Sequence, residues 1–284
     1  MAFLTILLVL FIDRVLWDGS PYREHTWFHR YLDRINAGRW LDDRSWGAPA
    51  AILPLLLLLG WLQISLFPMV GEFFEFALAT GVLLLSIGPR DLGRDTDDYL
   101  EARHAGDKAR TAQLAERFAS DATTGADPDN TVSNGILAGA CQRLIGPLFW
   151  FALFGVVGAA AYRLSHLLSE RLLNGPDPLS PLARSASAMR YVLDWAPIRV
   201  TAAGYAVAGN FDAVAAAWKQ CSQLDGDAEC PSDEAMLVAT GHAALEQSSS
   251  RPTAALIEDS LALVWRNLTL WVVFIGAVTL FGAL

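Results

Sequence analysis

Long apolar runs without charges alternate with polar regions along this chain. A helix needs about 20 apolar residues to cross a bilayer core about 30 Å thick. The segments that approach this pattern are Met1–Ile12, Gly47–Phe67, Phe76–Gly88, Leu144–Ala161 and Leu268–Leu284. The pattern therefore predicts an all-α fold, a polytopic helical membrane protein with four to six transmembrane helices and helical soluble segments.

The charge of the polar regions predicts their side of the membrane. Residues 18–46 and 89–143 are rich in Arg, whereas the turn at residues 68–71 contains no Lys or Arg. The positive-inside rule places both Arg-rich regions in the cytoplasm and the turn outside. Residues 162–264 then lie outside, unless Leu193–Gly209 also crosses or re-enters the membrane.

These patterns divide the chain into five parts. They are N-terminal membrane helices with an Arg-rich loop (1–88), a helical hairpin and linker (89–143), a central membrane core (144–209), an acidic helical segment (210–263) and a C-terminal transmembrane helix (264–284). Ala105-Gly106-Asp107 interrupts the helical pattern and predicts the turn of the hairpin. Asn210 and Ser232 are predicted to cap the helices that follow them.

Composition agrees with the membrane class. Hydrophobic residues make up 53% of the chain and charged residues 18%, against about 25% charged residues in soluble domains. The formal net charge of −9 argues against a nucleic-acid partner, which requires a basic face. We therefore expect the lipid bilayer, and no nucleic acid, as a partner.

Ionisable residues beside the predicted spans are the candidate binding residues. Asp194 and Arg199 flank Pro197, which is expected to break the helix, free backbone carbonyls and let the two ions meet across the bend. Ions at membrane depth persist only in a protein or water interior, so this pattern favours a binding cavity. A structural corner with an interfacial ion pair is the alternative. The other candidate ligand-binding residues are Trp150, Tyr162, Arg163 and His166.

A cluster of acids marks a second candidate site. Asp91, Asp95, Asp97 and Asp98 have a spacing that could hold Mg²⁺ for a phosphate substrate. The alternative is a helix N-terminus, which acidic side chains stabilise. Motifs of hydrolases, P-loop ATPases, dinucleotide enzymes and HExxH metalloproteases are absent from the sequence.

Two blocks of this chain resemble a known family. The run IGPLFWFALFGVVGAAAYRL (Ile145–Leu164) and the stretch YVLDWAPIRVTAAGYAVAG (Tyr191–Gly209) are similar to the AmpE family, as are the opening FLTILLVLFIDR and the apolar C-terminus. Members of that family are inner-membrane proteins described as regulatory modulators of β-lactamase induction in Gram-negative bacteria. The resemblance covers nearly the whole chain, in order.

A more distant resemblance links the chain to the cobinamide-phosphate synthases. Arg90-Asp91-Leu92, Ala105-Gly106-Asp107 and Ala109-Arg110 match an RDL…AGD…AR pattern of that family. The departures are Gly139-Ala140 where that family has Glu-Asn, His166-Leu167-Leu168-Ser169 where it has Asn-Thr-Leu-Asp, and Met189-Arg190 where it has paired Asp. A Mg²⁺- and nucleotide-dependent ligation would need those acids, so the departures indicate a retained scaffold with a changed or lost activity.

The AmpE resemblance implies a modulator of cell-wall-recycling signals in the bacterial inner membrane and not an enzyme. We expect an anionic wall-derived or lipid-linked ligand near Trp150, Tyr162, Asp194 and Arg199, and no cofactor. A cell-wall-recycling amidase or another regulatory protein is the expected partner, and the sequence leaves the oligomeric state open. A membrane enzyme with altered substrate is the first alternative, and a transporter is the second.

Overall fold

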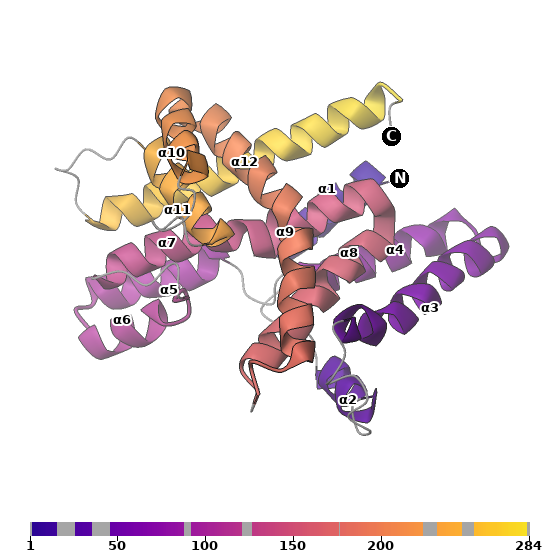
Figure 1. Cartoon of the computed structure of the whole chain (residues 1–284). Coiled ribbons are helices and arrows are strands. Elements are labelled where there is room, and N and C mark those ends of the chain that lie inside the picture. Colours follow the sequence, from indigo (N-terminus) through magenta and orange to yellow (C-terminus); the bar gives the residue numbers. More distant parts are fainter. Residues whose placement is uncertain are drawn as a thin grey trace. The chain divides into compact units, whose positions relative to one another are not determined.

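The computed structural model describes residues 2–15, 26–35, 46–87, 92–120, 127–175, 177–223, 232–245 and 253–282. Within these ranges every regular element is a helix (Figure 1), which confirms the predicted all-α class. The chain divides into two compact units. The first contains residues 1–89 and 146–194, and the second contains residues 90–145 and 195–284.

The described residues of the first unit form six helices, the last of them only in part. They are α1 (Ala2–Val15), α2 (Thr26–Ile35), α3 (Gly47–Val70), α4 (Glu72–Ser86), α8 (Gly146–Leu173) and the first part of α9 (Pro181–Ala208). Helix α8 packs against α1, α3 and α4. Phe28 and Leu32 of α2 join Ile52 of α3, Leu168 of α8 and Ala186 of α9 in one buried apolar cluster. This cluster fixes α2 across three longer helices.

Helix α8 is a hairpin of two limbs that meet at Gly155. Gly155 has φ 62° and ψ −145°, a backbone conformation that glycine adopts far more readily than other residues. A Cβ at Gly146 would overlap the Tyr162 ring, and one at Gly158 would overlap the Trp150 carbonyl. Residues 146 and 162 would be about 24 Å apart in a straight helix, so the chain reverses direction within α8 (Figure 1).

The hairpin corrects one prediction. Leu144–Ala161 was expected to cross the membrane as a single span, but the chain folds back on itself inside that segment. The part of this segment before Gly155 continues α7 and the π-helical turn without a break, and the part after Gly155 belongs to the returning limb. An uncharged run has the same composition whether it is straight or folded, so hydropathy did not reveal the turn.

In the part of the second unit that the structure describes there are seven helical elements and the rest of α9. They are α5 (Leu92–His104), α6 (Lys108–Ala115), α7 (Pro128–Ala140), a π-helical turn (Cys141–Ile145), α10 (Phe211–Gln223), α11 (Asp233–Ala244) and α12 (Thr253–Leu280). Helix α7 packs along α12, where the Ser133 and Ser260 hydroxyls lie 2.8 Å apart. The Tyr205 hydroxyl of α9 donates to the Leu137 carbonyl of α7 at 2.8 Å.

Local signals in the second unit were predicted correctly. Helices α5 and α6 form the expected hairpin, and the Asp107 side chain accepts from the Arg110 amide at the start of α6. The Asn210 side chain accepts from the Ala213 amide, and the Ser232 hydroxyl accepts from the Ala235 amide. Each cap satisfies a backbone N–H that has no partner inside its helix.

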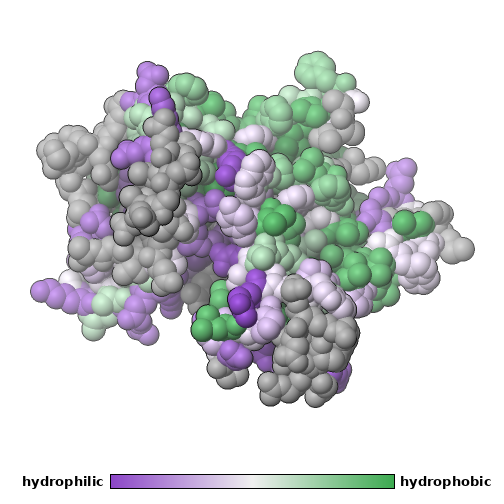
Figure 2. Space-filling view, in the orientation of Figure 1, coloured by the Kyte–Doolittle hydropathy of each residue, from purple (hydrophilic) through white to green (hydrophobic). Residues whose placement is uncertain are grey.

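Three segments of the described chain are long and apolar enough to cross a membrane: Gly47–Ser65, Pro128–Leu173 and Ala255–Leu280. The second of these contains the hairpin of α8. Phe3–Asp13 is a shorter apolar helix. Broad apolar areas are exposed on the face shown in Figure 2. Leu57, Trp61 and Ile64 of α3 are each more than half exposed. Soluble proteins rarely expose patches of this kind, so the surface supports a helical membrane protein.

Candidate functional site

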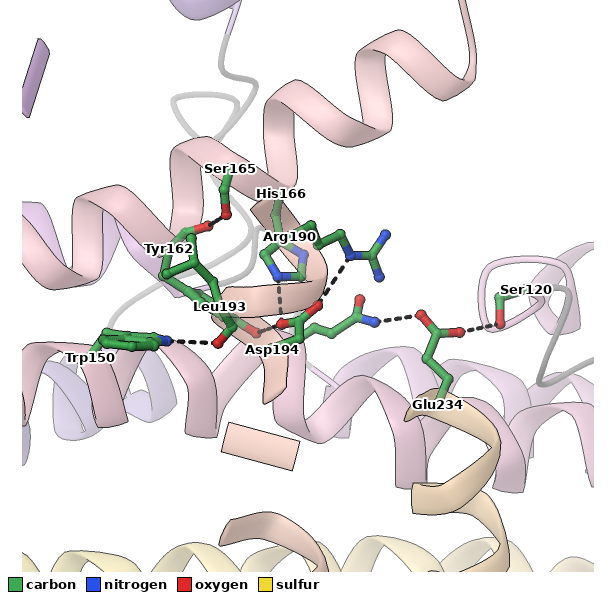
Figure 3. A network of polar contacts seen from close by, with 10 residues as sticks. Ser120, Trp150, Tyr162, Ser165, His166, Arg190, Leu193, Asp194 and Glu234 are labelled. Carbon is green, nitrogen blue, oxygen red and sulfur yellow. Dashed lines mark hydrogen bonds and ion pairs between the residues drawn. The ribbon is translucent and has the colours of Figure 1, made fainter. Parts of the chain in front are cut away.

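A buried carboxylate joins α8 to α9 in the first unit. Asp194 is only 6% exposed. Its Oδ1 accepts a hydrogen bond from the Tyr162 hydroxyl at 2.7 Å and lies 2.9 Å from His166 Nε2. Its Oδ2 accepts from Arg190 Nε at 3.3 Å (Figure 3). We call Tyr162, His166, Arg190 and Asp194 the Asp194 cluster.

Helical spacing explains how the Asp194 cluster forms. Tyr162 and His166 are four residues apart on the second limb of α8, so they share one face of that helix. Arg190 and Asp194 have the same spacing on α9. The Tyr162 and His166 rings lie 4.5 Å apart between centroids, and both point toward Asp194. Two ordinary i, i+4 pairs therefore meet where the helices cross.

Pro197 adds a second link between these helices. Proline has no N–H, so Pro197 cannot donate to the Leu193 carbonyl four residues earlier in the helix. Trp150 of the first α8 limb fills this position, because its Nε1 donates to the Leu193 carbonyl at 3.0 Å (Figure 3). The prediction that Pro197 would free a backbone carbonyl is therefore correct. The first limb of α8 therefore contacts α9 at Leu193, and the second limb contacts α9 at the next residue, Asp194.

The expected break at Pro197 is not present. Helix α9 continues from Pro181 through Pro197 to Ala208. Asp194 and Arg199 are five positions apart on this helix, which turns their side chains in different directions. Arg199 Nη1 donates to the Trp195 carbonyl at 2.9 Å, and its guanidinium lies 4.2 Å from the centroid of the Trp195 ring. The predicted meeting of the two ions across a bend is therefore wrong.

The Asp194 carboxylate is well suited to hold helices together. A carboxylate offers about four acceptor positions, and three neighbouring groups already face this one. A buried charge is tolerated only when it is paired and hydrogen-bonded. Tyr162 and Arg190 supply donors, and Arg190 also supplies the opposite charge. The chemistry of the cluster is therefore that of a polar clamp on two helices.

The six predicted binding residues are divided among three places. Tyr162, His166 and Asp194 belong to the Asp194 cluster, and Trp150 lies beside it. Arg163, one residue after Tyr162, lines a separate cavity of the first unit. Arg199 belongs to the second unit and contacts Trp195.

The predicted acidic cluster contains a neutralised carboxylate. Asp95 is 8% exposed, and its oxygens lie 3.4 Å from Arg117 Nη1 and 3.6 Å from Arg143 Nη1. Asp97 and Asp98 are exposed on the same helix. Asp91 lies outside the described residues. No group of three His, Cys, Asp or Glu side chains that could hold a metal ion occurs in the described part of the chain.

Comparison with known proteins assigns the family. The sequence profile of the family described as "Regulatory signalling modulator protein AmpE" matches residues 1–284. The chain belongs to the AmpE family. This membership confirms the resemblance inferred from the two motif blocks, which hold both Trp150 and Asp194.

Two curated relatives are each described as "Cobalamin biosynthesis protein CobD". The protein from Stutzerimonas stutzeri is 30% identical to this AmpE-family chain, over 99% of the chain and 98% of the relative. The protein from Chromobacterium violaceum is 22% identical, over 72% of the chain and 61% of the relative. No solved structure matches the chain.

Two further polar groups, in the second unit of this AmpE-family protein, were not predicted. Asp129 accepts from the Tyr99 hydroxyl at 2.6 Å and from Arg103 Nε at 2.9 Å. Burial, followed by the hydrogen bond to Asp129, raises the pKa of Tyr99 well above its usual value. Glu234 accepts from Ser120 and Gln142 at 3.0 and 2.6 Å (Figure 3). These partners are distant in sequence, so no local pattern indicates them.

Arg190 is the member of the Asp194 cluster that the site prediction lacked. A signal for it existed, because an Arg four residues before an Asp on one helix is a standard ion-pair spacing. The sequence comparison drew attention to Arg190 only as a departure from the acids of the cobinamide-phosphate synthases. The structure gives that departure a physical role.

Proposed function

We propose that this protein modulates the signalling that couples cell-wall recycling to β-lactamase induction, in the inner membrane of a Gram-negative bacterium. In this proposal it acts by binding and not by catalysis. Membership of the AmpE family supports a regulatory membrane protein. The observation that carries the proposal is the Asp194 cluster, which fastens α8 to α9 through a carboxylate with little room for another ligand.

The position of Arg190 supports binding over catalysis. The cobinamide-phosphate synthases, by resemblance, have paired Asp where this chain has Met189 and Arg190. Arg190 instead supplies the positive charge beside Asp194. A guanidinium that neutralises a carboxylate takes over the role that a bound cation would have there. The same is true of Asp95, which lies between Arg117 and Arg143.

Helix α9 provides a route for a regulatory signal. Its first part belongs to the first unit and its remainder to the second unit. A ligand or partner that favours one arrangement of α8 on α9 would change the population of that arrangement in proportion to its preference. The partner in this proposal is a cell-wall-recycling amidase or another regulatory protein, which contacts the polar helices of the second unit.

Complementation tests the proposed role. The chain is expressed at native level in a Gram-negative strain that has an inducible β-lactamase and lacks its own AmpE-family gene. The ratio of β-lactamase activity with and without an inducing β-lactam should return to that of the parent strain. A ratio equal to that of the empty vector, with the protein present in the membrane, would contradict the proposal.

A membrane enzyme with an altered substrate is the second candidate. The observation that favours it is the 30% identity to a cobalamin biosynthesis protein over nearly the whole of both chains. In this case the purified protein would show Mg²⁺-dependent turnover of a nucleotide or a muropeptide, and Asp91→Asn would abolish it. Turnover that depends on both the metal and Asp91 would replace the binding proposal with this one.

A further inference from the structure

Helix α2 has one flank that is not packed against the first unit. Phe28 and Leu32 are buried in the apolar cluster that joins α2 to α3, α8 and α9. Trp27, Arg30 and Arg34 are exposed, and for Trp27 the exposed fraction is 51%. These three residues are three and four positions apart, so they lie on the same side of the helix. We call Trp27, Arg30 and Arg34 the α2 flank.

The α2 flank carries positive charge beside an aromatic ring. The acidic residue of α2 is Asp33, and its carboxylate lies 2.5 Å from the Arg171 guanidinium of α8. The charge of Asp33 is therefore already balanced by a cation from another helix. Arg30 and Arg34 add two more guanidinium groups, about one helical turn apart. Cations combined with Trp on an amphipathic helix are typical of helices that lie at a membrane interface.

Helix α2 is attached to the beginning of a candidate membrane span. The Tyr31 hydroxyl of α2 donates to the Ala51 carbonyl of α3 at 2.9 Å. Ala51 lies near the start of Gly47–Ser65, which is long and apolar enough to cross a bilayer. The first turns of such a span lie close to the headgroups. Because α2 packs against this part of α3 (Figure 1), it lies at the level of a membrane surface.

The two ends of α3 differ in charge. The beginning of α3 is covered by α2, which carries Arg30 and Arg34. The other end is followed by Glu72 and Glu75 in the first turn of α4, and residues 66–75 contain no Lys or Arg. The cations of the α2 flank therefore mark one membrane surface. This asymmetry matches the distribution that the positive-inside rule describes.

We propose that the α2 flank binds the anionic phospholipid headgroups of the membrane surface at the beginning of α3. A guanidinium donates two hydrogen bonds to a phosphate group, and Trp is enriched at the headgroup level. Basic residues beside a membrane span are attracted to anionic lipids in this way. An acidic protein surface would match the two cations, but Trp27 and the neighbouring span favour the bilayer. The proposal does not rest on the regulatory role.

Amide hydrogen exchange of the full chain in lipid nanodiscs tests this contact. One set of nanodiscs contains phosphatidylcholine alone, and the other contains phosphatidylglycerol as well. Amides of α2 should exchange at least about tenfold more slowly when phosphatidylglycerol is present, because each Arg at an anionic surface shifts the opening equilibrium about fivefold. High salt should reduce this difference, since it screens exposed charges.

Paired variants assign the effect to the α2 flank. Arg30→Gln combined with Arg34→Gln should abolish the dependence on phosphatidylglycerol. Arg30→Lys combined with Arg34→Lys keeps the charge and should retain most of it. Lys108→Gln combined with Arg110→Gln removes two exposed cations from α6, and this matched control should behave like the wild type.

The same measurement contains its own folding control. Exchange of the α3 and α8 amides shows whether each variant is folded. Equal exchange of α2 in the two kinds of nanodisc would overturn the proposal and leave an acidic protein surface as the occupant of the flank. An undiminished lipid dependence in the folded double Gln variant would overturn it as well. Neither result would affect the complementation test.

Discussion

At the residue scale, the N–H that Pro197 lacks explains why Trp150 lies beside Leu193 and Asp194. Pro197 cannot donate to the Leu193 carbonyl, and an unpaired carbonyl in an apolar interior costs about 1–3 kcal/mol. The Trp150 indole provides the donor at 3.0 Å. The sequence allowed both residues to be singled out, but the pairing joins positions that only the hairpin of α8 brings together.

Trp150→Phe should therefore destabilise the protein by about 1–3 kcal/mol, because it leaves the Leu193 carbonyl without its donor. Pro197→Ala restores a backbone N–H for the same carbonyl, so the loss caused by Trp150→Phe should be smaller in that background. Unfolding of the four proteins in detergent measures this coupling. Trp61→Phe, at an exposed Trp of α3, is the control. Equal losses in both backgrounds would show that Pro197 and Trp150 are not linked.

His242 predicts a dependence of stability on pH. Burial lowers the pKa of His242 below its usual value of about 6.5. The unfolded chain then binds a proton more readily than the folded chain as the pH falls. The contribution of neutral His242 to the free energy of unfolding should be fully present above a pH of about 6.5. This contribution should be lost as the pH falls through the pKa that His242 has in the folded protein, which is lower. Melting temperatures from pH 7.5 to 5 should show this decrease, and His242→Gln should reduce it. An unchanged slope in His242→Gln would assign the acid sensitivity to other groups.

At the scale of helices, features set by residues close together in the sequence were predicted, whereas features set by contacts between distant residues were not. The hairpin of α5 and α6 and the caps at Asn210 and Ser232 were predicted because turn and capping residues act within a few positions. The fold of α8 was not predicted, because Gly155 lies in an uncharged run that satisfies a hydropathy criterion in either shape. The close approaches at Gly146 and Gly158 require knowledge of which residues face each other.

Gly155→Ala should destabilise the hairpin of α8 by about 1–3 kcal/mol, because a Cβ strains a backbone with φ 62°. Gly81→Ala is the matched control in an open position of α4, where no atom lies near an added Cβ. Alanine favours a helix there, so this variant should be as stable as the wild type or more so. Thermal unfolding in detergent compares the two variants. Equal stability of both would argue against the turn at Gly155.

At the scale of the whole molecule, apolar periodicity identified the class of the protein, and motif resemblance identified its family. The match over residues 1–284 confirms the AmpE resemblance, and the exposed leucines of α3 agree with a lipid-facing surface. The roles of individual charges were harder to predict, because hydropathy ignores how side chains pair across helices. Asp194 and Arg199 illustrate this, since the expected partners have different contacts.

Membrane topology is predicted from the distribution of Arg. Alkaline phosphatase fused at Gly71, in the turn after α3, should be active because the positive-inside rule places this turn outside the cytoplasm. A fusion at Gly106, between α5 and α6, should be inactive. Phosphatase activity normalised to the amount of fusion protein measures both. Activity at Gly106 and none at Gly71 would reverse the assignment.

The central claim is that the Asp194 cluster carries the regulatory function by joining α8 to α9. The most direct test is β-lactamase induction in the complemented deletion strain with Asp194→Asn and Tyr162→Phe, using exposed Asp212→Asn as the control. Immunoblots of membranes select conditions in which all proteins are equally abundant. We predict that both cluster variants lose most of the restored induction while Asp212→Asn retains it. Wild-type induction by Asp194→Asn at equal abundance would contradict the claim.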